Sequence, residues 1–572
     1  MDSNLENNKE LEKTSLVTKG NDNENMDSLE NNLNIINEIE TSDKDNASKS
    51  LEDVVYTKPK KSHGLLIFFI ILLILAIIGA GTYYFYFKDR KKSADVTIDS
   101  NKYLAYKLLS NGLEEFDLYF LKLNNTKLNK LYSPLSIKYA MEMLSLGASG
   151  NTKTQIDNII GSYKANKYTN SSNMSFANAL FVKDSDKSKF EVKLDYINGL
   201  KDSFNADVIY DDFKTPDMVN SWVSERTFNL VNNLVSDISN KDFILLNALA
   251  IDMEWVNKIQ PTSGWYIGFN HENYYKGVGM FSARGYTDIE FEGLDYTVDA
   301  SHIAAVANRY DIVATLGEDN IRTTITNEYN AWKEEHAGEP YYEFEDTELF
   351  VNKFIEELKE NYNKIGSSTD FSFYDDESVR VFAKDLKEYD GMTLEYIGIM
   401  PKVDNLDTFV SNMNSTSINE LLGKLKNIEP SSFKDGVVTE IDAYIPVFKF
   451  EYELNLIDNL KELGITDVFD AEKANLSNIN KKAYVSEALH KANIEFSNDG
   501  IKAAAATFVG GGGGGDYRFE HLYEVPVEKI DLTFNKPFMF IIRDKSTSEV
   551  WFAGTVYEPL EDGGNFNLGS GR

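Results

Sequence analysis

Side chains that carry most protein chemistry are scarce in this chain. Its 572 residues include no cysteine and only six histidines. The lack of cysteine excludes thiolate nucleophiles, thiolate metal ligands and disulfide bonds. His271, His302 and His336 do not follow the spacing of metal ligands, and we expect all three to be surface residues. The sequence therefore predicts no metal site.

Two glycine-containing segments could be taken for catalytic or nucleotide-binding motifs. Gly147-Ala-Ser-Gly150 does not satisfy the Gly-x-Ser-x-Gly pattern of a nucleophile elbow, and no strand is expected before it. The six glycines from Gly510 to Gly515 are followed by Asp516 and Tyr517, whereas a phosphate-binding loop continues with Gly-Lys-Ser/Thr. We therefore expect no enzymatic activity and no cofactor.

The segment from Glu495 to Gly515 has the composition of a strand that could enter an existing sheet. Its four alanines lie between Gly500 and the glycine run, which leaves too little chain for a helix of roughly twelve residues. With the period of a strand, successive side chains point to opposite faces. One face carries Ile501, Ala503, Ala505, Thr507 and Val509, and the other carries Lys502, Ala504, Ala506 and Phe508.

Charge and hydropathy divide the chain before the large domain begins. A net charge of -33 disfavours nucleic acid as a partner, because phosphates call for a basic surface. Residues 1–63 form an acidic tail whose composition predicts disorder. Gly64–Phe87 carries no charge and is long enough for a helix that spans the lipid bilayer. Basic residues flank it on both sides, so the positive-inside rule does not decide its orientation.

After a juxtamembrane linker, residues 88–98, we expect one large α+β domain over residues 99–560 and a flexible tail over 561–572. Apolar residues spaced three and four apart predict helices in its first part, and short apolar runs predict buried strands later. The expected helices are Tyr103–Leu123 and Ser136–Leu146; the expected strands are Phe243–Leu249, Leu394–Met400, Ile445–Phe450 and Phe538–Ile542.

A family resemblance begins at Leu131–Ile156, where the sequence LYSPLSIKYAMEMLSLGASGNTKTQI resembles the serpin signature. Seven further segments resemble serpin segments and follow in the family's order. They are Ser175–Val182, Phe204–Phe213, Val219–Thr227, Leu245–Trp255, Ile445–Phe469, Ala483–Phe496 and Phe534–Asp544. The resemblance implies a serpin fold of helices and three β-sheets, with a reactive loop able to insert into the main sheet, preceded here by one transmembrane helix.

The resemblance also implies roles for particular residues. Gly500 with residues 501–507 resembles the proximal hinge of the reactive loop, Gly-Thr-Glu-Ala-Ala-Ala-Ala-Thr. Ile501 and Lys502 depart from that pattern, although neither prevents a strand. Four residues match the shutter under the centre of the main sheet: Ser133, Ser136, Asn247 and His490. Trp255 matches the tryptophan at the top of that sheet.

The bond offered to a protease stays open at this stage. Counted from the hinge glycine, it falls at Gly514–Gly515; counted back from Phe534–Pro537, it falls near Pro526. The loop is therefore longer than is usual in the family, and its glycines add conformational entropy. Because a Gly-Gly bond gives a protease little to recognise, Tyr517–Arg518 and Arg518–Phe519 are alternatives.

The chain between Trp255 and Leu394 is longer than the family needs, which indicates an insertion within residues 256–390. Inside it, Tyr341–Ile365 lacks Gly and Pro and predicts a helix with an apolar face, which serves either for packing or as an exosite. The residues of this face are Phe350, Phe354, Leu358 and Tyr362.

Two classes of function remain. The first is a monomeric, single-pass membrane serpin with an extracellular inhibitory domain, which traps a serine or a cysteine protease by suicide-substrate insertion of its cleaved loop. The second is a non-inhibitory serpin-fold protein that binds a partner through the insertion and the glycine-rich loop. The hinge alanines favour the first class, and the glycine run with Ile501 favours the second.

Overall fold

The computed structural model divides the chain into two units, Met1–Asp95 and Val96–Arg572, and all described residues lie in the second. They are residues 104–561 without 124–126, 186–187, 258–285, 364–370, 498–499, 502–518, 520, 522 and 524. No helix among these described residues is both long and apolar enough to cross a bilayer. The predicted transmembrane segment Gly64–Phe87 and the predicted N-terminal tail lie outside this part of the chain, and so does His271. Of the predicted C-terminal tail, 561–572, only Glu561 is described, and it forms a β-bridge with Val298.

A seven-stranded antiparallel sheet contains the longest buried apolar runs. Residues of β18 such as Phe538, Phe540 and Ile542 are fully buried because helices and a second sheet cover its two faces. Its strands follow the order β1 (Lys130–Tyr132), β19 (Val550–Val556), β18 (Phe538–Asp544), β11 (Leu394–Pro401), β10 (Val379–Asp385), β9 (Phe371–Asp375) and β12 (Lys426–Asn427).

A four-stranded sheet packs beside it in the order β17 (Val527–Thr533), β13 (Val438–Pro446), β8 (Thr297–Asn308) and β7 (Tyr286–Glu290). β13 and β17 are parallel and paired over seven positions, while the other pairs are antiparallel. The single strand expected over Ile445–Phe450 is wrong. It spans the end of β13 at Pro446, which has no N–H to donate, and the start of the next strand at Phe448.

The remaining strands form two sets that face each other. In the first set, β2 (Met174–Ser185) pairs with β3 (Ser188–Lys189), β4 (Asp207–Asp211) and β5 (Phe243–Ile251). In the second set, β14 (Phe448–Asn455) pairs with β15 (Leu489–Phe496). A two-residue strand, β16 (Gly500–Ile501), pairs with β15 on one side and with β6 (Met253–Glu254), just beyond β5, on the other. β16 therefore joins the two sets at one end.

The longest helix against these strands, α5 (Pro134–Gly147), confirms the helix expected over Ser136–Leu146. Pro134 at its first position and the Ser133 cap fix where it begins. The other helices of this region are α6 (Gly150–Ile160), α7 (Leu194–Phe204), α8 (Asp217–Arg226), α12 (Leu406–Asn412), α13 (Ser415–Leu422) and α14 (Ile457–Glu462).

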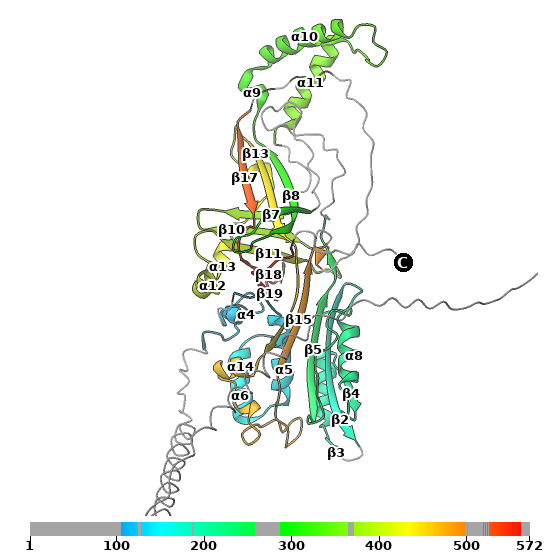
Figure 1. Ribbon diagram of the computed structural model, residues 1–572, viewed down its shortest axis with the longest axis vertical. Coiled ribbons are helices and arrows are strands. Elements are labelled where there is room, and N and C mark those ends of the chain that lie inside the picture. The colour runs from blue at the N-terminus through cyan, green and yellow to red at the C-terminus, as the bar shows by residue number, and fades with distance from the viewer. Residues whose placement is uncertain are drawn as a thin grey trace, which may run out of the picture. The chain divides into compact units, whose positions relative to one another are not determined.

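Two sequence-based expectations about the order of elements are corrected by the structure. The single helix expected over Tyr103–Leu123 is wrong. The chain bends at Ser110, Asn111 and Gly112, and between residues 105 and 123 only α4 (Glu115–Tyr119) is helical. The mixed α and β class is confirmed, but helices and strands alternate along the chain. Three helices, α9 (Ile312–Leu316), α10 (Glu318–Glu335) and α11 (Thr347–Asn361), lie between β8 and β9 (Figure 1).

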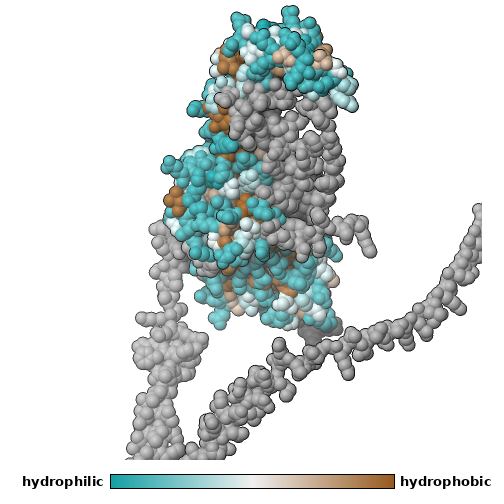
Figure 2. Space-filling view, turned by 45° about the horizontal axis from the view of Figure 1, so that its top comes forward, coloured by the Kyte–Doolittle hydropathy of each residue, from teal (hydrophilic) through white to brown (hydrophobic). Residues whose placement is uncertain are grey.

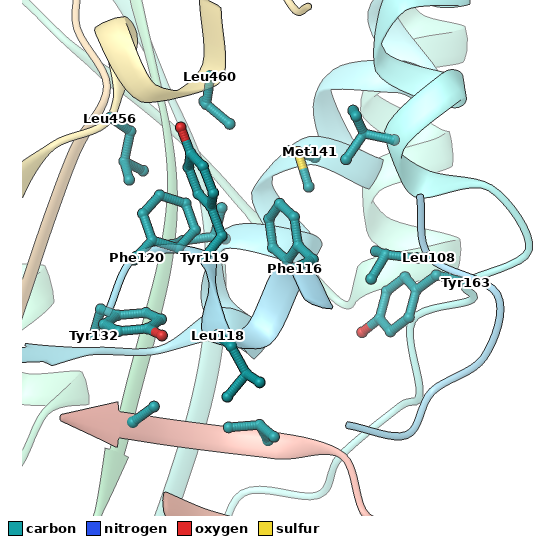
Figure 3. Close-up of a cluster of buried hydrophobic side chains, with 14 of the residues drawn as sticks. Leu108, Phe116, Leu118, Tyr119, Phe120, Tyr132, Met141, Tyr163, Leu456 and Leu460 are labelled. Atoms are coloured by element: carbon teal, nitrogen blue, oxygen red, sulfur yellow. The ribbon is translucent and has the colours of Figure 1, made fainter. Parts of the chain in front are cut away.

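Aromatic residues of α4 anchor the N-terminal part of the domain. Phe116, Tyr119 and Phe120 point into a cluster that includes Tyr132 of β1 (Figure 3). The rings of Phe116 and Phe120 meet edge to face at 5.7 Å, and those of Phe120 and Tyr132 lie 5.2 Å apart. Such pairs stabilise a core beyond the area that they bury.

His302 is not a surface residue, which contradicts the expectation from sequence. It lies on β8, is 1% exposed and forms a 2.8 Å contact from Nε2 to Asp442 Oδ1 of β13. Its ring stacks on Tyr444 with the ring centres 4.1 Å apart. His336 is half-buried beside Trp332 at the end of α10, so it is not fully exposed either. The sequence around a single histidine in an apolar strand does not show which residue of the neighbouring strand will lie next to it, so this pairing could not be predicted.

An ion pair holds α5 to α4 in the core. Lys138 Nζ lies 2.6 Å from Asp117 Oδ1, and both side chains are 0% exposed. Burial raises the pKa of Asp117, and the Lys138 ammonium acts in the opposite direction. Removal of one partner would leave a buried charge without compensation.

We therefore expect Lys138→Met to lower the free energy of unfolding by about 3–5 kcal/mol, as for other broken buried pairs. Asp117→Asn added to this variant should restore part of the loss, because the amide oxygen can still accept the Glu114 N–H. Urea unfolding followed by circular dichroism measures both effects. If Lys138→Met alone were as stable as the wild-type protein, the ion pair would not stabilise the core as described.

Candidate functional site

The candidate site is a slot between β5 and β15, the facing edges of the two strand sets. In the part of the chain that the structure describes, no ladder of hydrogen bonds joins these strands; β5 pairs with β2 and β15 pairs with β14. Among the described strands, only β16 pairs with both sets, at the end next to Ile251 and Phe496. Backbone N–H and C=O groups along a strand need partners, so an unfilled slot of this kind favours the entry of another strand.

Three cavities follow the slot from β16 downward. The first, about 20 Å³, lies between Leu249 of β5 and Ile494 of β15, with Ile501 at its end. The second, about 70 Å³, contains the polar residues expected at the shutter. The third, about 150 Å³, is mainly apolar and lies between Leu245 and Leu489. The space between the two strands is therefore incompletely filled along most of their length.

A segment that follows α8 crosses the outer side of the slot. α8 packs on β2 and β5 through Val219, Trp222 and Val223. Beyond it, the Leu230 carbonyl accepts a hydrogen bond from Asn493 Nδ2 at 3.2 Å, and the Asn233 carbonyl accepts one from Lys491 Nζ at 3.1 Å. Both donors belong to β15. A strand that entered the slot would have to pass beneath this segment.

The four predicted shutter residues line the same middle cavity. Ser133 N–H donates to His490 Nε2 at 2.9 Å, and Ser136 N–H donates to Ser133 Oγ at 3.0 Å. These bonds connect β15 to the first turn of α5. Since Nε2 accepts, the proton of the neutral imidazole is on Nδ1. Burial lowers the pKa of His490 to about 4, so the ring is neutral near pH 7.

Asn247 reaches the same cavity from β5, but its side chain is hydrogen-bonded to β2 and not to β15. Its Nδ2 donates to Asn178 Oδ1 of β2 at 2.8 Å, and Asn178 Nδ2 donates to the Phe204 carbonyl at 2.8 Å. Asn247 Oδ1 is buried and has no hydrogen-bond partner among the described residues. It is therefore an acceptor that an entering strand could satisfy.

Trp255 lies at the end of the slot where β16 is found. It is fully buried, and its Nε1 donates to the Ser497 carbonyl at 2.9 Å. Its ring packs edge to face on Tyr396 and Phe496. Ser497 N–H in turn donates to the Gly500 carbonyl at 3.0 Å, which closes the turn between β15 and β16. Trp255 thus supports the point at which the chain reverses.

Gly500 is required at this turn by close backbone approach. A Cβ atom at this position would lie 2.2 Å from the Met253 carbonyl oxygen and 2.7 Å from Glu254 Cα. The next residue, Ile501, is 2% exposed and packs in the core cluster that contains Met253 and Phe496. The first two residues of the predicted hinge therefore already form a strand at the end of the slot.

The other predicted loop residues divide by their place in the chain. Lys502, Ala503, Ala504, Ala505, Ala506 and Thr507 lie outside the described residues, and so do Gly514, Gly515, Tyr517 and Arg518. Phe519 is described and packs against α10 and α11. Pro526 directly precedes β17, and its carbonyl accepts the Val438 N–H at 2.9 Å.

Sequence reasoning missed several residues that complete the site. Asn178 carries the amide that holds Asn247, and Ser497 carries the carbonyl that holds Trp255. Neither forms a motif by itself, because each is defined by a partner far away in the chain. The alternation of polar residues along SFANALFV does place Asn178 on a strand, which was the one available signal.

The histidine at the centre of the slot makes stability depend on pH. Because the folded pKa of His490 lies at about 4, below its ordinary value of 6.5, the neutral ring favours the folded state. This contribution is complete above pH 6.5 and is lost as the pH falls towards 4. It amounts to about 3 kcal/mol. His490→Gln should lack this part of the acid sensitivity.

Urea unfolding of wild-type protein and variant at several pH values between 7 and 4 measures the difference. His336→Gln, which removes a histidine outside the slot, is the matched control. Equal acid sensitivity of the wild-type and His490→Gln proteins would show that the imidazole does not titrate in this way.

A sequence model described as Serpin (serine protease inhibitor) matches residues 116–298 and 345–559. Human neuroserpin is 26% identical over 458 residues, which are 75% of this chain and 86% of the relative. An uncharacterized serpin-like protein of Methanosarcina acetivorans is 23% identical over 495 residues, 81% of this chain and 90% of the relative.

Solved structures show the same fold. The native state of tengpin, a thermophilic serpin, gives a TM-score of 0.52 at 20% identity and covers 80% of this chain and 95% of that one. Thyroxine-binding globulin in complex with thyroxine gives a TM-score of 0.50 at 17% identity and covers 80% of this chain and all of that one, 100%.

Proposed function

Because the chain belongs to the serpin family, we propose that it inhibits a protease as a suicide substrate: the protease cleaves the reactive loop, and the cleaved loop enters the slot between β5 and β15. The observation that carries this proposal is β16, whose two residues already pair with β15 and β6 at the end of the slot. Entry would extend a strand that has begun to form.

The register of β16 supports this proposal. Ile501 is opposite Phe496 on one side and Met253 on the other, with antiparallel pairing on both sides. If the strand continued in this register, Thr507 would lie between His490 and Asn247, the two shutter residues that face each other across the slot. Its hydroxyl could then donate to the buried Asn247 Oδ1.

The two faces of the hinge also suit the slot. Ile501 points into the core, so Ala503, Ala505 and Thr507 would point the same way in a continuous strand. Small side chains there match the small first cavity. Lys502 would lie on the opposite face, where its charge can remain in water.

The proposed chemistry belongs to the protease. Its catalytic serine or cysteine attacks a loop carbonyl, the peptide bond breaks, and the N-terminal part of the loop stays attached as an acyl ester or thioester. Insertion of that part into the slot forms new strand hydrogen bonds and carries the protease away from the loop's other half. The serpin contributes the cleavable bond and the energy released by strand insertion.

The proposal includes several features beyond inhibition. We propose a single-pass membrane anchor through residues 64–87, an extracellular inhibitory domain, a monomeric state and an insertion relative to other serpins. The insertion is supported by the interruption of the family match between residues 298 and 345 and by the three helices α9–α11. Pro526 is tied to β13, which favours the bond counted from the hinge over one near Pro526.

A second candidate function is partner binding without protease trapping. Thyroxine-binding globulin has the same fold and was solved with thyroxine bound, so a serpin fold can also hold a ligand. Here the glycine-rich loop and the α10–α11 pair would form the contact surface. The hinge strand β16 favours inhibition, because a binding protein has no need of a strand poised at an open slot.

Mixing the full-length protein with trypsin-like, chymotrypsin-like, subtilisin-like and papain-like proteases tests the function. We expect an SDS-stable complex with at least one of them and a large increase in the thermal midpoint after loop cleavage, because the slot becomes filled. If every active protease cuts the loop and leaves free, with no gain in thermal midpoint, the protein is not an inhibitor of this kind.

The insertion step has its own test in two residues of the hinge. Ala505→Arg would place a charge on the buried face of the entering strand, so we expect loss of the SDS-stable complex by about tenfold or more and release of active protease. Lys502→Arg keeps the positive charge on the opposite face, next to the end of the slot where β16 lies, and should leave complex formation nearly unchanged. Equal complex formation by both variants would exclude the proposed register.

A further inference from the structure

The helices α10 and α11 form a pair whose core is completed by the segment that leads into β17. α10 lies wholly within residues 299–344, which the serpin family model does not match. Arg322 NH1 donates to Asn352 Oδ1 at 2.6 Å, and Lys359 pairs with Glu318 at 2.7 Å, so the two helices are joined on their outer side. Figure 1 shows the pair beyond one end of β8, β13 and β17.

The buried face of this pair follows the period of both helices. Residues three and four apart on a helix lie on one side, and here they meet across the pair. The expected helix over Tyr341–Ile365 is therefore α11, shorter at both ends. Of its predicted apolar face, Leu358 is buried, Phe350 and Phe354 are partly buried against the same cluster, and Tyr362 lies just beyond the end of the helix. The buried residues are Ile321, Ile325 and Tyr329 of α10 and Val351, Ile355 and Leu358 of α11.

The described residues Phe519, Tyr523 and Val525 of the loop's C-terminal arm belong to the same cluster. Tyr523 and Val525 are buried in it, together with Val306 of β8 and Val438 of β13. Phe519 is partly buried against it. This arm is therefore part of the packing between the helix pair and the sheet of β8 and β13.

Phe519 lies among three rings of the helix pair. It meets Tyr329 at 5.4 Å, Phe350 at 5.5 Å and Trp332 at 6.0 Å between ring centres, each time edge to face. Tyr329 and Phe350 stack at 3.8 Å and form the floor of this aromatic site. Edge-to-face contacts with several rings fix the position of a phenylalanine side chain.

Polar contacts hold the next residues of the arm. His521 Nδ1 hydrogen-bonds to the Glu328 carboxylate of α10. The His521 ring also meets Tyr523 at 4.3 Å. From Phe519 to Thr533, the chain thus contacts α10, α11 and β13 in succession. The face shown in Figure 2 is largely hydrophilic at the end that carries α10 and α11, as expected when their apolar side chains are used in this packing.

We propose that the α10–α11 pair is a docking platform for the C-terminal arm of the reactive loop, which captures Phe519 between Tyr329, Trp332 and Phe350 and confines cleavage to bonds on its N-terminal side. A protease must place the side chain before the cut in its own specificity pocket. The Phe519 ring is already held by the helix pair, so the bond after Phe519 is not offered. Arg518 and Tyr517 then remain as candidate recognition residues.

Brief digestion of the full-length protein with a chymotrypsin-like protease, followed by mass spectrometry, tests this proposal. Fragments that begin at residue 518 report cleavage after Tyr517, and fragments that begin at residue 520 report cleavage after Phe519. In the wild-type protein we expect cleavage after Phe519 to be at least about tenfold slower than after Tyr517. Trp332→Ala should raise the rate after Phe519 about tenfold, because the docked arm then opens more often.

Two further variants keep the test decisive. Tyr341 lies in the same helical region, but its side chain is 70% exposed. Cleavage after Phe519 in Tyr341→Ala should therefore be as slow as in the wild-type protein. Glu328→Gln weakens the His521 contact without touching the buried face and should raise cleavage after Phe519 several-fold, even if Trp332→Ala does not fold. Rapid cleavage after Phe519 in the wild-type protein, or no change in Glu328→Gln and a folded Trp332→Ala, would overturn the proposal.

The inference rests on the proposed function only in taking residues 502–518 as the bait. Its failure is distinguishable from failure of that function. Protection of Phe519 without any SDS-stable complex would support the docking platform and exclude inhibition. An SDS-stable complex together with rapid cleavage after Phe519 would support inhibition and exclude the docking platform.

Discussion

The structure depends on a main sheet that is one strand short. β5 and β15 face each other across cavities, and among the described residues their backbones are connected only through the two residues of β16. Hydrogen bonds that a central strand would make are therefore still to be formed. In the proposed mechanism, the free energy that drives inhibition comes from this difference between the present sheet and one with the slot filled.

Polar side chains keep the open arrangement specific. Ser133, His490 and Asn247 bring hydrogen-bonding groups from α5, β15 and β5 to the middle cavity. A buried polar group is costly without a partner, so these groups favour arrangements in which their bonds are made. The neutral His490 accepts from the Ser133 backbone now, while Asn247 keeps one acceptor without a partner among the described residues. Each edge of the slot thus keeps a buried amide oxygen without a hydrogen-bond partner among the described residues: Asn247 Oδ1 on β5 and Asn493 Oδ1 on β15.

Local patterns predicted much of this site and failed where distant parts of the chain decide. The strand alternation at Ile501 and the apolar spacing over Ser136–Leu146 are properties of neighbouring residues, and both Ile501 and α5 lie as those patterns indicate. The helix expected over Tyr103–Leu123 is not formed as one element, because Ser110, Asn111 and Gly112 favour a bend more strongly than the apolar spacing favours a helix. His302 failed because β13 covers it. No local pattern could show that Phe519 would pack on Tyr329, since the two belong to segments that only the fold brings together.

The docking of Phe519 changes the physical meaning of the glycine run. The loop is held at Ile501 by β16 and at Phe519 by the helix pair, and Gly510–Gly515 lies between these two points in sequence. Closing a longer loop between fixed ends adds little free energy, because the entropy cost grows only with the logarithm of its length. The larger cost arises when a protease orders the residues around the bond. That cost is lowest next to a residue that is already held, so a docked Phe519 favours Tyr517–Arg518 and Arg518–Phe519 as bait over Gly514–Gly515. On this proposal, the glycines supply the length that the N-terminal part of the loop needs to reach down the slot once it is cut.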